Sequence, residues 1–258
     1  MPTDKKSGDP SGKKVFILYP HSVIKEKMLD SLIQHGFETY TLRDYKKAFR
    51  ALERFPDSIL LINIDEKLPD EKWETYIDRM LKDAKTKNSR LGVLSYNYDQ
   101  ELVKKYQDDM AVPCGYIKLS LSLRESTEII LNTLHANEAR GRRQHLRAFC
   151  EEGILASLSF HIDNKTYRSK ILDISEAGLA TRIQGLPEFA SNIRFRDAQL
   201  KLHRKLLSTD LILAGKRRDD ASVLIMLFDP EKLDDHANHS IRHFIIENLQ
   251  SYIEKITQ

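Results

Sequence analysis

The sequence lacks the features that mark a disulfide-stabilised domain, a zinc ribbon or a membrane protein. Only two cysteines occur in 258 residues, Cys114 and Cys150, and they do not form a Cys-x-x-Cys pair. No apolar run approaches the ~20 residues that span a bilayer, so no membrane insertion is expected. Residues 1–13 are polar and contain no signal-peptide hydrophobic stretch, so they are predicted to be a disordered tail of a cytoplasmic protein.

The common signatures of catalysis and cofactor binding are also missing. The sequence contains no Gly-x-x-x-x-Gly-Lys-Ser/Thr loop, no Gly-x-Gly-x-x-Gly turn and no Gly-x-Ser-x-Gly elbow. Three histidines, His236, His239 and His243, are the one cluster with metal-like spacing. Their polar surroundings are typical of the start of a helix. The sequence therefore predicts a protein that is not an enzyme, with no cofactor and no metal site.

Charge of one sign is not in excess. The chain has 41 basic and 38 acidic residues and a formal net charge of +3, too balanced to attract nucleic acid in bulk. No helix-turn-helix pattern and no strands of interleaved aromatic and basic residues occur, so no nucleic-acid partner is expected. Positive charge is concentrated locally at Arg140, Arg142, Arg143 and Arg147. This cluster favours an anionic ligand.

The first half of the chain alternates short apolar runs with amphipathic stretches, which is typical of a parallel sheet flanked by helices. Strands are expected at 15–19, 37–42, 59–62, 91–94 and 116–117, and helices at 23–35, 45–55, 73–84, 100–110 and 121–139. Five strands and five helices predict a flavodoxin-like doubly wound domain over residues 14–139.

The second half changes to a period of two, which is typical of strands. Alternation begins at 154–160, short apolar runs follow near 171 and 179–183, and further strands are expected at 193–195, 199–203, 208–214 and 222–228. Apolar residues spaced three or four apart over 241–256 predict an amphipathic terminal helix that packs on the strands, on the first domain or on another chain. The fold class is therefore α/β plus β, with a small antiparallel barrel and a terminal helix over residues 140–258.

The first half resembles the receiver domain of two-component signalling. Asp65, after the third strand, matches the phosphoacceptor of that family, and Ser95 and Lys118 match its hydroxyl and lysine positions. The acid pair that binds magnesium in the family is replaced by Tyr19-Pro20-His21. Because phosphoryl transfer to a carboxylate needs a cation, a pseudo-receiver that docks or dimerises is favoured over one phosphorylated at Asp65.

The second half resembles the PilZ family on two short motifs. Arg143 and Arg147 match its Arg-x-x-x-Arg motif, and Asp173-Ile-Ser175-Glu-Ala-Gly178 matches its (Asp/Asn)-x-Ser-x-x-Gly motif. The resemblance implies a barrel that binds cyclic dimeric GMP. It assigns the ligand to Arg143, Arg147, Asp173, Ser175 and Gly178.

The residue types suit such a ligand, which carries two phosphates and two guanines. Arginine forks onto phosphate or onto guanine O6 and N7, and Arg142 is a further candidate beside Arg143. Asp173 can accept from the donor edge of guanine, and Ser175 can add a hydroxyl contact. Gly178 would permit a turn or a close backbone approach.

These observations predict a cyclic dimeric GMP receptor in which the ligand changes the orientation of the two domains and so an interaction with a protein partner. The partner is unidentified, and a second copy of the chain is one option. Two alternatives stay open: a scaffold that binds proteins without nucleotide, and a phospho-regulated receiver that acts through Asp65.

Overall fold

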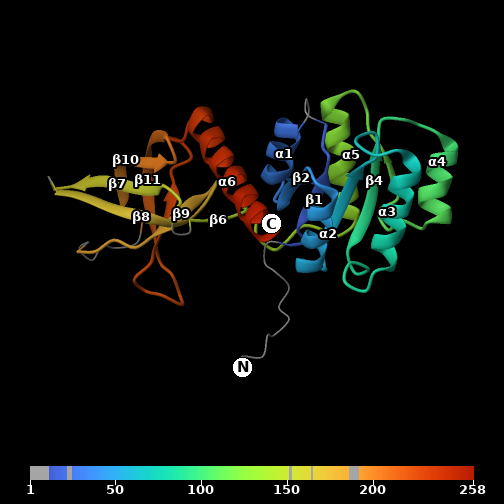
Figure 1. Cartoon of the computed structure of the whole chain (residues 1–258). Coiled ribbons are helices and arrows are strands. Elements are labelled where there is room, and N and C mark those ends of the chain that lie inside the picture. The colour runs from blue at the N-terminus through green and yellow to red at the C-terminus, as the bar shows by residue number, and fades with distance from the viewer. Residues whose placement is uncertain (1–11, 22–24, 151–152, 164, 186–191) are drawn as a thin grey trace. The chain divides into compact units, whose positions relative to one another are not determined.

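The computed structural model describes residues 12–21, 25–150, 153–163, 165–185 and 192–258 (Figure 1). They form two compact units, one made of the described residues through Gln144 with Gln250–Gln258, the other of His145–Leu249. Most of the predicted tail, residues 1–11, lies outside the described residues. Gly12, near its end, forms an isolated antiparallel bridge with Arg140, and the Lys13 amide donates to the carbonyl of Ala139 (3.0 Å). The predicted domain boundaries at 13/14 and 139/140 stay predictions.

The N-terminal unit is built on a parallel sheet of five described strands in the order β2-β1-β3-β4-β5, with helices on both sides (Figure 1). The strands are β1 (Val15–Leu18), β2 (Thr39–Leu42), β3 (Ile59–Asn63), β4 (Arg90–Ser95) and β5 (Tyr116–Lys118). The helices are α1 (Lys25–Gln34), α2 (Tyr45–Arg54), α3 (Asp70–Lys82), α4 (Gln100–Lys104), which continues as the π-helical segment η1 (Lys105–Asp109), and α5 (Leu123–Ala136). The predicted flavodoxin-like fold is confirmed, since this order and direction define it.

Burial explains why these segments are strands. All residues of β1, β2 and β3 are buried, as expected where helices cover both faces of a parallel sheet. Val15, Ile17 and Leu61 pack with α1 and α5 in one apolar cluster. Helix starts follow local capping: Asp44 accepts from the Lys46 amide (2.7 Å) at α2, and Ser122 from the Glu125 amide (3.4 Å) at α5.

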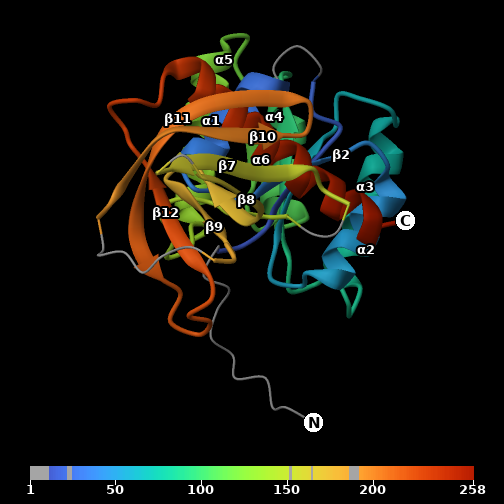
Figure 2. The ribbon, with the colours of Figure 1, turned by 90° about the vertical axis from the view of Figure 1, so that its left-hand side faces the viewer.

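The C-terminal unit is an antiparallel barrel, and its prediction from the period-two pattern is confirmed. Its strands are β6 (Ala148–Phe149), β7 (Ala156–Ile162), β8 (Lys165–Ser175), β9 (Gly178–Thr181), β10 (Arg194–Leu202), β11 (Lys205–Lys216) and β12 (Leu224–Phe228). The described strands pair in the order β6-β8-β7-β10-β11-β12-β9, and β9 pairs back onto β8, which closes the ring (Figure 2). The two strands expected at 193–195 and 199–203 form one strand, β10, with a bulge between Phe195 and Ala198.

The terminal helix α6 (Asp235–Ile256) begins earlier than its apolar stripe predicts. Ile241, Phe244 and Ile245 are buried in the apolar core of the barrel, so the first part of the stripe packs on the strands. The last residues belong to the N-terminal unit, where the side chain of Gln250 bonds the backbone amide (3.0 Å) and carbonyl (2.9 Å) of Thr41.

Gly178 is required where β9 meets β12. It pairs with Leu227, and a Cβ at this position would overlap the carbonyl oxygen of Met226. Both neighbours are strand backbone, which cannot move without breaking the ring of strands. The predicted close approach at this glycine therefore occurs, and it is to the chain itself.

Gly178→Ala should destabilise the protein by about 1–3 kcal/mol, because the added methyl group forces β9 and β12 apart. Urea denaturation of the whole chain, followed by far-UV circular dichroism, measures this change. A denaturation midpoint equal to that of the wild type would contradict the steric role of Gly178.

Candidate ligand-binding site

The Asp-x-Ser-x-x-Gly segment forms the end of β8, a tight turn and the start of β9. Ser175 pairs with Gly178 across the turn, and the Ser175 hydroxyl donates to the Gly178 carbonyl (3.2 Å). The hydroxyl is buried and already has an acceptor. Ser175 therefore stabilises the turn in this structure, and its predicted contact with a ligand stays a prediction.

Asp173 is a buried carboxylate, with only 4% of the residue exposed. It lies between β6 and β9, since it pairs with Phe149 on one side and with Ala180 on the other. The register of β8 against β9 shifts between Ile171 and Asp173. A buried carboxylate is costly unless cations or hydrogen-bond donors surround it.

Two guanidinium groups supply that compensation. Arg147, one residue before β6, places Nη1 3.6 Å from Oδ1 of Asp173. Arg217, one residue after β11, donates from Nη2 to Oδ2 of the same carboxylate. The two arginines come from segments far apart in the sequence, and each carboxylate oxygen faces a separate cation.

Arg217 was not among the residues predicted for the site. It stands in a basic run, Lys216-Arg217-Arg218, which directly follows the apolar strand β11. That run is the one signal in the sequence that points to Arg217. Nothing in the sequence pairs it with Asp173, because strand pairing alone brings the two residues together.

The three predicted arginines do not all lie in the barrel. Arg147 belongs to the same compact unit as Asp173, whereas Arg142 and Arg143 group with the N-terminal unit. There the backbone of Arg143 passes close to Gly36, after α1. The roles of Arg142 and Arg143 toward a ligand stay predictions.

A second ion-pair cluster lies on the β8–β9 turn. Glu176 accepts from Nη1 of Arg242 on α6 (3.0 Å), and Nδ1 of His145 lies 3.9 Å from its other oxygen. Glu176 and Arg242 are both mostly buried. The turn that carries the motif is thereby linked to α6 and to the segment that precedes Arg147.

The free thiol of Cys150 lies beside this site and is partly buried. Burial, and after it the negative charge of Asp173, raises the pKa of Cys150 to about 12. The thiol therefore stays protonated at neutral pH. Burial likewise raises the pKa of Cys114 to about 11.

In the N-terminal unit, Asp65 is exposed two residues after β3. Both of its carboxylate oxygens accept hydrogen bonds. The Ser95 hydroxyl donates to Oδ1 (2.5 Å), and the Tyr96 amide donates to Oδ2 (2.7 Å). Lys118 instead places its ammonium group 4.5 Å from the centre of the Tyr98 ring. Asp65 and Ser95 thus meet as the receiver resemblance implies. Phosphorylation of Asp65 stays a prediction.

The described residues contain no group of three or more histidine, cysteine, aspartate or glutamate side chains that is arranged to hold a metal ion. Within the same ranges, no helix is both long and apolar enough to cross a membrane.

No family model matches the sequence, and no curated protein matches it significantly. Solved structures do match. The PilZ domain of Escherichia coli YcgR, solved with c-di-GMP, is 15% identical, with 44% of this chain and 96% of that chain covered and a TM-score of 0.37. K. pneumonia MrkH, in complex with c-di-GMP, is 19% identical over 40% of this chain and 50% of its own, with a TM-score of 0.33.

A receiver protein matches as well. The chemotaxis response regulator CheY4 of Vibrio cholerae is 16% identical, with 49% of this chain and 98% of that chain covered and a TM-score of 0.39. The neighbours thus include PilZ-domain proteins and a receiver, the two families that the motifs resemble. The chain spans about half the length of whole YcgR and of MrkH.

The pair between Asp173 and Arg217 should stabilise the barrel. Arg217→Ala leaves a buried carboxylate with one distant cation, so the free energy of unfolding should fall by about 1–3 kcal/mol. In a double-mutant cycle with Asp173→Ala, the loss of unfolding free energy in the double variant should be smaller than the sum of the losses in the two single variants. Denaturant titration measures all four proteins.

Arg182→Ala is the matched control, because its ion pair with Asp220 is exposed and surface pairs contribute little. Additive losses at Asp173 and Arg217, or an equal loss in the control, would contradict the pairing.

Proposed function

We propose that this chain is a receptor for cyclic dimeric GMP and that the ligand binds around Asp173. The observation that carries the proposal is a buried carboxylate at the end of β8 that faces two guanidinium groups beside a tight glycine turn. This is a small set of charged groups converging on one point, with both a hydrogen-bond acceptor and fork-shaped donors.

Guanine matches both kinds of group. Its N2 amino group donates hydrogen bonds, which a carboxylate can accept. Its O6 and N7 atoms accept hydrogen bonds, and one arginine can donate to both. Asp173 would take the donor edge, while Arg147 would bind O6 and N7 or a phosphate. Arg147 is well placed to turn from Asp173 to the ligand. Its Nη1 lies 3.6 Å from Oδ1 of Asp173, and its side chain is 40% exposed.

Arg217 holds Asp173 ready for the ligand. Its contact with the carboxylate is closer than that of Arg147, and its side chain is less exposed, 28% against 40%. The closer, more buried partner fixes the carboxylate in place. The more exposed partner is the one that can turn toward a ligand at little cost.

Arg142 and Arg143 would complete the clamp from the connection that precedes Arg147. Two phosphates and two guanines offer more acceptors than Arg147 alone can bind. A ligand that joins these arginines to Asp173 would set the orientation of one unit relative to the other and alter a surface used by a protein partner. The proposed role is binding, not catalysis.

Arg143→Ala and Arg147→Ala should each weaken binding of cyclic dimeric GMP by roughly 30-fold or more. Removing one partner of a desolvated charge contact costs ~2 kcal/mol or more. Isothermal titration calorimetry measures the loss, and circular dichroism should be unchanged.

Arg196→Ala, which removes an exposed arginine from β10, is the control and should bind as the wild type does. Linear GMP and cyclic dimeric AMP serve as ligand controls. Unaltered affinity in the first two variants would reject the assignment of the arginines. No binding by the wild type would reject the receptor proposal and leave the scaffold.

A further inference from the structure

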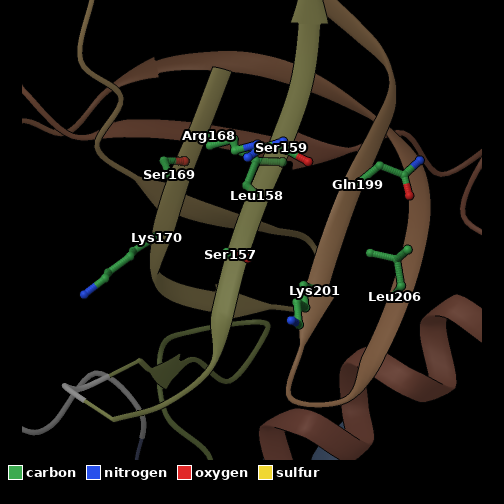
Figure 3. A pocket seen from close by; sticks show the side chains of 9 residues that line it. All are labelled: Ser157, Leu158, Ser159, Arg168, Ser169, Lys170, Gln199, Lys201 and Leu206. Carbon is green, nitrogen blue, oxygen red and sulfur yellow. The ribbon is translucent and has the colours of Figure 1, made fainter. Parts of the chain in front are cut away.

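A hollow of about 590 Å³ lies on the outer surface of the barrel, over β7, β8, β10 and the start of β11 (Figure 3). Ser157 and Ser159 on β7 line it, together with longer side chains from the neighbouring strands. It has no part in the proposed nucleotide site, since Asp173, Arg147 and Arg217 do not line it.

The strand register places lysines on both sides of a serine. Ser157 pairs with Lys170 on β8 and with Lys201 on β10, and Ser159 pairs with Arg168 and Gln199 in the same way. Adjacent strands are ~4.8 Å apart, so the two lysines flank the small serine across roughly 10 Å. In Figure 3, Arg168 extends toward Ser159, whereas the Lys170 side chain points away from β7 and from Lys201.

The charge of the hollow is of one sign. Arg168, Lys170 and Lys201 are exposed, and none of the three has an ion-pair partner among the described residues. No aspartate or glutamate lines the hollow. Exposed like charges about 10 Å apart are screened at physiological salt, so these cations attract an anion most strongly at low ionic strength. The Arg168 guanidinium group and the neighbouring Ser159 hydroxyl are hydrogen-bond donors that suit a phosphate group.

Apolar residues are exposed beside these cations. Leu206, on the rim of the hollow, is 67% exposed, and Leu155 is 63% exposed. The carbonyl of Leu155 accepts from the His203 amide (2.7 Å), so it lies next to the turn between β10 and β11. Two more exposed cations follow, Arg204 in that turn and Lys205 at the start of β11. Cations interleaved with exposed leucines are typical of surfaces that bind anionic lipid.

We propose that this face of the barrel binds anionic phospholipid membranes peripherally. A lipid phosphate occupies the hollow that Arg168, Lys170 and Lys201 line, and Leu206 and Leu155 enter the interfacial region. The attraction is electrostatic in the main, so it weakens as ionic strength rises.

Flotation of the full chain with lipid vesicles tests the proposal. The wild type should float with vesicles of phosphatidylcholine and phosphatidylglycerol at low salt, and not with phosphatidylcholine alone. The double substitution Lys170→Ala with Lys201→Ala should lower partitioning by about 25-fold, on the basis of about fivefold per charge near the surface. Leu206→Ser should lower it further without changing its salt dependence.

The matched control is Lys87→Ala with Lys232→Ala, which removes the same charge from exposed positions outside the hollow and should float like the wild type. Equal losses in the two double variants would mean that net charge alone acts, and would overturn the proposal. So would the absence of binding to anionic vesicles. Binding of free glycerol 3-phosphate without vesicle binding would assign the hollow to a soluble phosphate and overturn the membrane role.

Discussion

The carboxylate of Asp173 is the constraint on which the C-terminal unit depends. It is buried between two strands, and a buried negative charge is tolerated only where positive charge meets it. Arg147 and Arg217 supply that charge from segments that precede β6 and follow β11. The barrel must therefore close correctly before the site exists. The same convergence of charges makes the site a receptor for guanine and phosphate groups in our proposal.

The Asp-x-Ser-x-x-Gly segment also has a structural role, which its resemblance to the PilZ motif does not reveal. Ser175 and Gly178 form the turn between β8 and β9, and Gly178 lets β12 approach the turn closely. Glu176 in the same turn binds Arg242 of α6. A change in Asp173 or its partners therefore acts on a segment that also holds the barrel closed. Binding and stability have to be measured separately for each variant.

Much of the fold could be predicted from the sequence because periodicity records burial directly. The apolar runs that begin at Val15 and Ile59 became buried parallel strands, and the alternation predicted at 154–160 falls largely within the barrel strand β7. The contact between Arg217 and Asp173 could not be predicted, since it depends on the pairing of strands that are far apart in the sequence. The same is true of the hollow beside Lys201, which exists only because β7 places small serines between two basic strands.

The most direct test of the central claim is to follow the arginine side chains themselves. Nitrogen-15 nuclear magnetic resonance resolves the Nε–H groups of Arg147 and Arg217, which can be assigned from single arginine-to-lysine variants. Our account predicts that both signals shift saturably when cyclic dimeric GMP is added, and that neither shifts with cyclic dimeric AMP. Signals that stay unchanged at saturating cyclic dimeric GMP would contradict the claim that the ligand binds at Asp173.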